Sequence, residues 1–572
     1  MDKLNETSNN RIMRLKNFIR NHYSTIFFLL LLTVIVSVIT YYRILAQLHI
    51  GLISDSVDFF TDALVFAGQG FGYADLSRPP FFPFIASLFV RLGYTSINTI
   101  FYVDGGSFVF GVIGLFLLLK TKFNDLESFL GGLLYATFPI TITILGFGFS
   151  DLSSVSFSIW AMYFMVLAVR KDSKFFLLLF PFALFAFLAR YNNALLIFPI
   201  LLYLFINKDK IDIKNILIGI IASILIIIPV LLFFYEKFGN ILATFMNFSS
   251  TSSTTTGTFV SATYNPNIFY FVNGFPSFIG PQGITALLII LLGIFLYLFI
   301  RFRRNNKDKA LVERSYLKDN TIKIKLLLFV ILTIVFLGSF DKTSYLVSEV
   351  LFFLTAIIFY DITKNLNIKD LDLHIMFFTW FMAFFIFSSV FVIKDNRYFL
   401  LMAPSVAYFI ILGLSAISNS LKIKFKNKNI VFPVFAIFLI SILLLSTATQ
   451  IPDVLHANND KAIANEQFEM ASQWFINYDP SYKNQNIYSD LWPNFSWYLK
   501  TNVKPVPIFK DNQTLYNGGV NNNTFNQKDS NQFNNYLINN NADYYLSVRP
   551  GLNLTSYTPI KKFGIVTIYK KN

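Results

Sequence analysis

The chain has 572 residues, of which 55% are hydrophobic, 18% aromatic and only 14% charged. This composition offers more apolar surface than a water-soluble core can bury, so it excludes a soluble globular protein and predicts an integral membrane protein. The absence of cysteine excludes disulfides, thiolate metal sites and cysteine nucleophiles. The formal net charge of +15 is expected in cytoplasmic loops, and we predict no nucleic-acid partner.

Apolar segments along the chain predict about 13 membrane spans, because each approaches the length that crosses the hydrocarbon layer. They cover residues 24–45, 96–119, 127–147, 151–169, 174–190, 192–206, 215–235, 283–300, 324–339, 343–360, 373–393, 398–417 and 430–449. The first segment follows a polar, basic N-terminus, and it is too long for the apolar part of a cleaved signal peptide, which is about 7–15 residues. We therefore predict that it is retained as the first span.

The distribution of basic residues predicts the topology. With the N-terminus in the cytoplasm, the segments expected inside hold 28 of the 47 lysines and arginines, whereas the short outer segments hold eight and the tail 11. This bias follows the positive-inside rule. An odd number of spans then places residues 450–572 outside. The prediction is a multi-pass protein of the plasma (cell) membrane, and the abundance of Asn, Lys and Ile is typical of a low-GC prokaryote, archaea included.

Residues 450–572 differ from the rest because they are rich in Asn, Tyr and Asp. The stretches "KAIANEQFEMASQWFINY" and "SNQFNNYLINN" have the pattern of amphipathic helices, and "NIYSDLWP", "ADYYLSV" and "GIVTIYKK" have the pattern of short strands. Trp492, Trp497 and Tyr498 lie beside these strands, where they either stack on sugar rings or fill the core. The predicted fold class is an all-α polytopic membrane bundle over residues 1–449, followed by a small extracytoplasmic α/β domain.

Polar residues from several predicted outer loops share one membrane face. They are Asp55, Asp58, Asp62, Arg78, Asp151, Arg190, Asn192, Asp341, Lys342, Asp395 and Arg397. Charge near the hydrocarbon is costly and is usually paired or functional, so this mixed set predicts a polar cavity at the outer end of the bundle. The alternative is that the ends of the spans simply carry charges.

The first outer loop, residues 46–95, contains two distinctive signals. The stretch "SDSVDFFTDALVFAGQG" predicts a short helix in which Asp55 or Ser56 is the N-cap, although Asp55 could instead serve as a general base at head-group depth. Arg78 precedes a Pro-Pro step and a second predicted interfacial helix, "FFPFIASLFVRLG". A guanidinium held there either binds a lipid phosphate or simply extends to the membrane surface.

This acidic loop with its Pro-Pro step, together with "FLARYNNALLIFPILLY" and "KDNRYFLLMAPSVAYF", resembles the GT-C membrane glycosyltransferases. The resemblance is to the protein O-mannosyltransferase and lipid A aminoarabinose transferase group in particular, and it covers most of the first 420 residues. It implies transfer of a sugar from a polyprenyl-phosphate donor, of the dolichyl or undecaprenyl type, to a protein, lipid or glycan acceptor at the outer face, with inversion at the anomeric carbon.

The resemblance also implies roles for individual residues. Asp55 matches the catalytic acidic position, but Ser56 replaces the second member of the usual acidic pair, so Asp58 competes for the role of base. By the same match, Arg78 and Arg397 bind the donor phosphate. Arg190 is assigned to the phosphate less specifically, and Asp151, Asn192, Lys342 and Asp395 are further outer-face polar residues.

A pair of arginines can hold a departing lipid phosphate, so the chemistry requires no cofactor and no metal ion. A divalent ion on Asp55 or Asp58 stays open as an alternative. Two other functions also stay open: a transporter or flippase of lipid-linked sugars, and a lipid-linked glycan ligase or polymerase. A flippase is expected to place polar residues within its spans, whereas here most spans are apolar in their middles and the charge gathers at one face.

Overall fold

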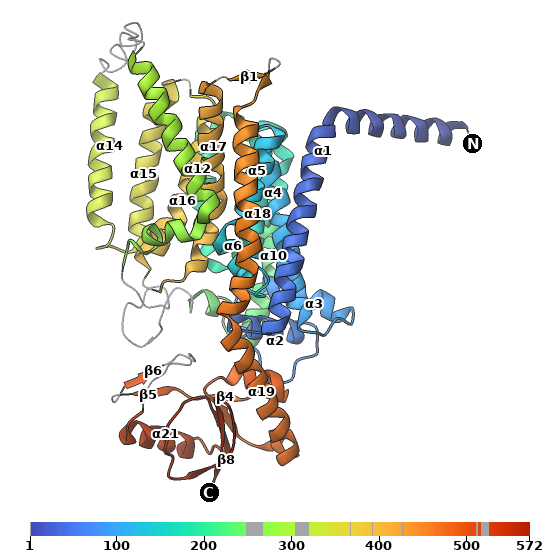
Figure 1. The fold of residues 1–572 in the computed structure, drawn as a ribbon, viewed down its shortest axis with the longest axis vertical. Coiled ribbons are helices and arrows are strands. Elements are labelled where there is room, and N and C mark those ends of the chain that lie inside the picture. Colours follow the sequence, from blue (N-terminus) through green and yellow to red (C-terminus); the bar gives the residue numbers. More distant parts are fainter. Residues whose placement is uncertain are drawn as a thin grey trace.

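The computed structural model describes residues 2–246, 267–303, 320–366, 368–391, 393–421, 423–425, 428–510, 513–515 and 525–572. A bundle of long helices forms most of the molecule, and a small domain containing the C-terminus lies at one end of it (Figure 1). Within the described ranges, ten helices are long and apolar enough to cross a membrane. The predicted fold class, a polytopic helical bundle with a small C-terminal α/β domain, is confirmed.

The helices of the bundle have the following bounds. They are α1 (Asp2–Ile50), α4 (Asn98–Lys120), α5 (Asp125–Thr137), α6 (Pro139–Ile144), α7 (Ser150–Arg170), α8 (Phe176–Ala189), α9 (Ile197–Ile206), α10 (Ile213–Phe238), α12 (Tyr270–Arg303), α14 (Asn320–Ser339), α15 (Tyr345–Thr363), α16 (Leu371–Val390), α17 (Ala403–Leu421) and α18 (Val431–Ala457). Short 3-10 turns η1 (Ser173–Phe175), η2 (Tyr191–Leu196), η3 (Lys208–Lys210), η4 (Lys364–Leu366) and η5 (Asn396–Leu401) join some of them, and strands β1 (Lys424–Phe425) and β2 (Lys428–Asn429) form a small hairpin.

Three predicted spans are shorter or broken helices. The segment 127–147 forms α5 and α6, because Phe138 has an extended ψ of 136° and Pro139 starts the next helix. The segments 174–190 and 192–206 form α8 and α9, which are separated at Arg190, a residue with extended φ and ψ of −158° and 117°. The break at Arg190 matters for the site, because it turns a polar side chain out of the apolar helices.

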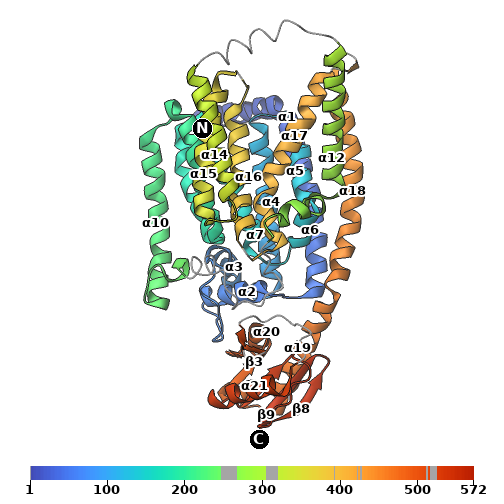
Figure 2. The same cartoon turned by 90° about the vertical axis from the view of Figure 1, so that its left-hand side faces the viewer.

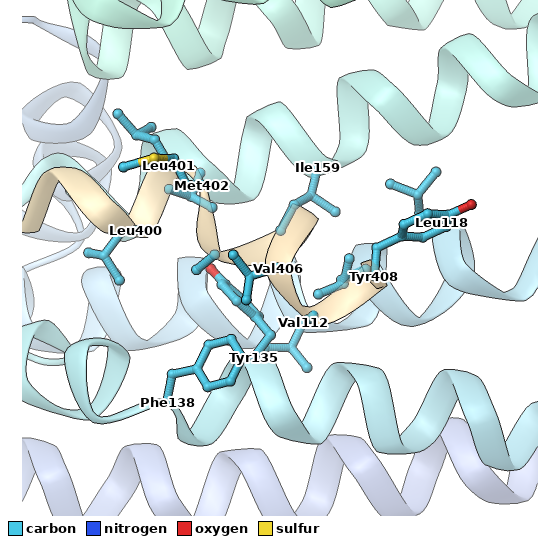
Figure 3. Packing of buried hydrophobic residues seen from close by; sticks show 14 of the residues in the cluster. Val112, Leu118, Tyr135, Phe138, Ile159, Leu400, Leu401, Met402, Val406 and Tyr408 are labelled. Carbon is cyan, nitrogen blue, oxygen red and sulfur yellow. The ribbon is translucent and has the colours of Figure 1, made fainter. Parts of the chain in front are cut away.

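The core of the bundle is apolar and closely packed. Figure 3 shows Tyr135 of α5 among Val112 of α4, Val406 of α17 and Phe138, all of them buried. Helices α4 and α7 come very close at Gly111, where an added Cβ would lie 2.1 Å from the Ser156 hydroxyl oxygen. Such packing fixes the relative positions of the outer helix ends.

Two short helices, α2 (Asp55–Phe66) and α3 (Phe81–Arg91), form the first outer loop, as the sequence predicts. They lie between the bundle and the C-terminal domain (Figure 2). Ser54, with a positive φ of 47°, is the residue before α2, and no side chain caps that helix. The prediction that Asp55 or Ser56 is the N-cap is therefore wrong. The Asp55 carboxylate instead contacts two arginines, described below.

The C-terminal domain contains a five-stranded sheet in the order β4-β3-β7-β9-β8. Its elements are α19 (Asn459–Tyr478), η6 (Tyr482–Asn484), β3 (Ile487–Ser489), α20 (Trp492–Leu499), β4 (Lys504–Pro505), β5 (Ile508–Lys510), β6 (Gln513–Leu515), α21 (Gln527–Asn539), β7 (Tyr544–Ser547), β8 (Tyr557–Phe563) and β9 (Val566–Lys571). Strand β3 pairs in parallel with both β4 and β7, whereas β9 is antiparallel to β7 and β8. The two predicted helices of the tail and the strands predicted over 542–548 and 564–571 are confirmed. The strand predicted over 486–493 ends at Ser489, because Trp492 already begins α20, and α18 continues past residue 449 to Ala457.

The C-terminal domain is fastened to the first outer loop by specific contacts. The Asn465 side-chain amide of α19 donates hydrogen bonds of 2.8 and 2.9 Å to the carbonyl oxygens of Ile50 and Leu52. The Trp497 ring packs against Phe60 of α2, with ring centroids 5.1 Å apart. Trp497 therefore fills an interface, and the stretch that leads into Asp55 is held from both sides.

We predict that Asn465→Ala destabilises the protein, because it leaves two buried carbonyl oxygens without their donors, at a cost of about 1–3 kcal/mol. Thermal unfolding of the purified protein in detergent is the measurement. Glu466→Ala, at the next and exposed position of α19, is the matched control and should unfold like the wild type. Equal melting temperatures for the two variants would show that the asparagine does not fasten the loop.

Candidate functional site

A polar cavity of about 590 Å³ lies at the end of the bundle that faces the C-terminal domain. Its lining residues come from α2, the segment before α3, the start of α7, the break after α8, the segment after α10, and the end of α16 with the segment that follows it. They are Asp55, Phe59, Asp75, Ser77, Arg78, Pro79, Ser150, Asp151, Arg190, Tyr191, Asn192, Thr244, Phe387, Phe391, Arg397 and Tyr398. Residues more than 300 positions apart in the chain thus face one hollow.

Asp55 bridges two arginines in this cavity. One oxygen, Oδ2, accepts a hydrogen bond of 2.7 Å from Nη1 of Arg397. The other, Oδ1, lies 3.3 Å from Nη1 of Arg78. The carboxylate is only 19% exposed and stands at the first residue of α2, where the helix dipole also favours a negative charge.

Arg78 is the centre of an acidic cluster in the first outer loop. Besides Asp55, it contacts Asp58 at 2.5 Å and, through Nε, Asp75 at 3.1 Å. The Tyr73 hydroxyl donates a hydrogen bond of 2.6 Å to the second oxygen of Asp58. Asp58 is therefore held in place from two sides, and it in turn holds the Arg78 guanidinium at the cavity wall.

Arg190 and Arg397 share the carboxylate of Asp151 at the start of α7. Arg190 donates a hydrogen bond to it, and Nη1 of Arg397 lies 3.8 Å from its other oxygen. Asp395 accepts the backbone N–H of Arg397 at 3.0 Å and approaches its Nε at 3.1 Å. Because each guanidinium is tied to carboxylates, all three arginines are held in position at the cavity wall.

An aromatic ring packs against each of the same three guanidinium groups. Arg78 lies over Phe59, with its central carbon 5.5 Å from the ring centroid, and Arg397 lies over Phe149 at 5.2 Å. Arg190 stacks on Tyr398 at 5.0 Å. Cations over aromatic faces are favoured by about 0.5–2 kcal/mol, so these rings help to hold the guanidinium groups in place.

The charge environment separates the two aspartates that the sequence proposed as bases. Burial alone would raise the pKa of Asp55, but Arg397 and Arg78 outweigh it and hold that pKa below its usual value. For Asp58 burial prevails over Arg78 and Tyr73 and raises the pKa to about 6. Asp55 thus carries a stable negative charge, whereas Asp58 gains a proton in mildly acidic solution.

The side chain of Asn192 can accept a further hydrogen bond. It lines the cavity and is only 6% exposed. Within the part of the chain that the structure describes, its side-chain oxygen has no hydrogen-bond partner. A buried amide oxygen left without a donor costs stability, so this group is suited to meet a polar group of a ligand.

The structure brings most of the predicted site residues together. Asp55, Arg78, Asp151, Arg190, Asn192 and Arg397 line the cavity, and Asp58 and Asp395 contact its arginines. Lys342 does not reach it: this residue is exposed in the turn between α14 and α15 and does not line the cavity.

Sequence reasoning missed Tyr73, Asp75 and the supporting rings. Asp75 carried a usable signal, because it stands three residues before Arg78 and the two side chains meet at that spacing. No pattern in the sequence pairs Tyr73 with Asp58 or Tyr398 with Arg190, since these contacts depend on the path of the loops.

The described residues contain no group of three or more His, Cys, Asp or Glu side chains arranged to hold a metal ion. The carboxylates nearest the cavity are instead engaged by arginines: Asp55 by Arg397, Asp58 by Arg78 and Asp151 by Arg190. A divalent ion would have to compete with these guanidinium groups for its ligands.

Residues 77–233 match the family model described as dolichyl-phosphate-mannose-protein mannosyltransferase, and this match covers less than a third of the chain. ArnT from Cupriavidus metallidurans, solved with bound undecaprenyl phosphate, is 11% identical and superposes with a TM-score of 0.53 over 94% of this chain and 97% of ArnT. The chain has the GT-C fold. The predicted resemblance to GT-C glycosyltransferases is thereby confirmed, and the predicted enzyme class, glycosyltransferase, agrees with the matched family.

A second solved structure shows a weaker likeness. The archaeal oligosaccharyltransferase AglB from Archaeoglobus fulgidus, in complex with an inhibitory peptide and a dolichol-phosphate, is 13% identical with a TM-score of 0.48. The likeness covers 92% of this chain and 70% of AglB. Curated proteins gave no match.

We predict that Asp55→Asn lowers the melting temperature, because Arg397 and Arg78 lose a charged partner in a buried site. An added anion that binds these arginines should raise the melting temperature again. Thermal unfolding is measured in sodium sulfate and in sodium chloride of equal ionic strength. Sulfate should stabilise this variant more than the wild type.

The control for general salt effects is Asp460→Asn, which changes an exposed carboxylate of α19. Its melting temperature should respond to sulfate as that of the wild type does. The same sulfate response in all three proteins would refute the view that Asp55 neutralises the arginines.

Proposed function

We propose that this protein transfers a sugar from a polyprenyl-phosphate donor, of the dolichyl or undecaprenyl type, to a hydroxyl group of an acceptor at the outer membrane face. The observation that carries the proposal is the cavity in which three arginines and the Asp55 carboxylate meet. The family match supports it, since residues 77–233 include Arg78, Asp151 and Arg190. The acceptor classes are a protein, a lipid and a glycan.

The arginines are the proposed binding site for the donor phosphate. Arg78, Arg190 and Arg397 all line the cavity. Each guanidinium carries paired N–H donors in the geometry that suits two phosphate oxygens. In the structure their partners are carboxylates, so the donor phosphate binds by taking over part of these contacts. Once the sugar leaves, the phosphate gains negative charge, and the fixed arginines stabilise that product more than the bound donor.

An apolar groove beside the cavity is the proposed site for the polyprenyl chain. Its volume is about 420 Å³, and it lies between α3, α8 and α10. Pro79 lines the polar cavity while Pro80 and Phe81 line the groove, so the segment that begins with Arg78 connects the two. A lipid phosphate can therefore place its head on the arginines and its chain along the groove.

Asp55 is the proposed general base. The acceptor hydroxyl gives its proton to the Asp55 carboxylate while its oxygen forms a bond to the anomeric carbon. The bond from that carbon to the phosphate oxygen breaks, and its electron pair stays with the lipid phosphate. Attack from the side opposite the leaving group inverts the configuration at this carbon.

The arginines couple donor binding to the strength of the base. Arg397 and Arg78 hold the pKa of Asp55 down against the effect of burial. When the donor phosphate draws on the same guanidinium groups, this lowering weakens and the pKa of Asp55 rises. Asp55 then takes a proton more readily, which suits general-base catalysis near neutral pH. Without a bound donor, Asp55 remains a weak base and therefore does not activate a water molecule.

Asp58 has a positioning role in this proposal. It contacts Arg78 and Tyr73 and does not line the donor cavity. Asn192, whose side-chain oxygen is buried at the cavity wall, is the proposed contact for a hydroxyl of the donor sugar. We further propose that the N-terminus is cytoplasmic and that the cavity and the C-terminal domain, which lie at the same end of the bundle, face outward.

The test is transfer by the purified protein in detergent, with dolichyl phosphate mannose carrying a labelled mannose. Wild type should release the label to an acceptor or to water, and Asp55→Asn should lose about 10²–10⁴ of that rate, as expected for a positioned base. Donor affinity should be retained or increased in this variant, because the arginines that bind the phosphate remain and lose a competing carboxylate.

The matched control is Asp341→Asn, an exposed carboxylate on the same predicted face, which should retain full transfer. Full transfer by Asp55→Asn would remove the base assignment. Movement of label across a liposome membrane without transfer would replace the proposal with a flippase.

A further inference from the structure

A second cavity, of about 550 Å³, lies between the first outer loop and the C-terminal domain and shares Asp55 and Arg78 with the first. We call it the cleft. Its lining residues are Leu52, Ile53, Ser54, Asp55, Asp58, Arg78, Lys461, Ala464, Asn465, Phe468, Asp490, Leu491, Trp492, Pro493 and Asn494. Asp55 and Arg78 line both cavities, so the catalytic carboxylate stands in the wall between them.

We infer that the cleft binds the acceptor and that the acceptor is a saccharide, which presents a hydroxyl group to Asp55 from the side opposite the donor. This inference rests on the proposed function, because it assigns the second substrate of the same reaction. Two hollows that meet at one carboxylate supply what an inverting displacement needs. The leaving phosphate lies on one side of the reacting carbon, and the attacking hydroxyl arrives from the other.

In the C-terminal domain, the strand end at which a ligand is expected to bind lies at the cleft. The chain runs from β3 to β4 on one side and then returns to β7 on the other, and both neighbours are parallel to β3. Ligands of open parallel sheets bind outside the carboxyl ends of the strands at such a reversal. Residues 490–494, which directly follow β3, are the ones that line the cleft.

Asp490 makes this edge rigid. Its carboxylate accepts hydrogen bonds from the Tyr545 hydroxyl, the Ser547 hydroxyl and the Val548 backbone N–H, at 2.5, 2.8 and 3.0 Å, and it pairs with Arg549 at 2.7 Å. Asp490 is therefore fully engaged inside the domain and serves to fix the turn that carries Trp492 and Asn494.

The chemistry of the cleft favours a saccharide over an extended peptide. Trp492 is half-buried, packs partly against the core of the C-terminal domain and also lines the cleft, and an aromatic ring suits the C–H face of a sugar. Across the described residues no hydrogen bond ties down the Asn494 amide, which can both donate to and accept from hydroxyl groups. A peptide commonly binds by pairing with a strand, but the cleft is lined by helices and turns.

The volume agrees with this class of ligand. Small-molecule sites measure about 300–1,000 Å³, and the cleft lies within that range. Lys461 adds one cation at the rim, where its amine is hydrogen-bonded to the side-chain oxygen of Asn458 at 2.8 Å. The ring of Trp492, the amide of Asn494 and the amine of Lys461 thus line the same cleft as the Asp55 carboxylate.

The experiment uses the full chain in detergent with dolichyl phosphate mannose and two sets of probe acceptors, methyl glycosides and serine- or threonine-containing hexapeptides. Transfer to water in the absence of an acceptor reports the donor site and Asp55 alone. Trp492→Ala and Asn494→Ala should raise the KM for a methyl glycoside at least tenfold, with donor affinity and transfer to water unchanged. Trp474→Ala, a tryptophan of the same domain that lies outside the cleft and stacks on Tyr478, is the matched control and should behave like the wild type.

The outcomes separate the two proposals. If the wild type transfers label neither to water nor to any probe acceptor, or if this transfer does not depend on Asp55, the proposed function itself is overturned. If that transfer is present, an unchanged glycoside KM in both cleft variants overturns the cleft. Transfer to the hexapeptides alone, or to no glycoside at all, overturns the saccharide class.

Discussion

The account depends on the sharing of Asp55 between Arg397 and Arg78 at the end of a membrane bundle that faces the C-terminal domain. Each charge of this set would be costly near the hydrocarbon by itself, and each is made tolerable by the others. The helices bring these charges together. Asp151 lies in the first turn of α7, Arg190 lies at the break after α8, and Arg397 lies in the turn after α16. The first outer loop closes the set from the side of the C-terminal domain.

This arrangement joins stability to function. Paired carboxylates keep the guanidinium groups in position without a substrate, and a lipid phosphate can take over those contacts when it binds. In the proposed mechanism, the strength of Asp55 as a base depends on whether a donor is present, since the arginines proposed to bind the phosphate also hold the pKa of Asp55 down. The C-terminal domain contributes by fixing the loop on which Asp55 stands and by forming the far wall of the second hollow.

Much of this could be predicted from the sequence. Apolar length gave the bundle, alternation gave the strands of the tail, and the clustering of charge at one face led to Asp55, Arg78 and Arg397, which do share one cavity. The cap predicted for α2 was wrong, because a carboxylate at a helix start looks the same in sequence whether it binds its own backbone or distant arginines. Tyr73, the rings under the arginines and the second cavity depend on long-range packing, which no local pattern encodes. Lys342 shows a different failure of prediction: it was predicted on the same membrane face, but its exposed side chain does not line the cavity.

The exchange of arginine contacts between carboxylate and phosphate is tested most directly by the pH dependence of donor affinity. Burial raises the pKa of Asp58 to about 6, so this carboxylate becomes neutral as the pH falls through that value and releases part of Arg78. The phosphodiester of dolichyl phosphate mannose keeps its single charge throughout. The dissociation constant should therefore fall about fivefold, or about 1 kcal/mol, between pH 7.5 and pH 5, and it should be flat in Asp58→Asn. A wild-type affinity that is constant or weaker at pH 5 would contradict the account.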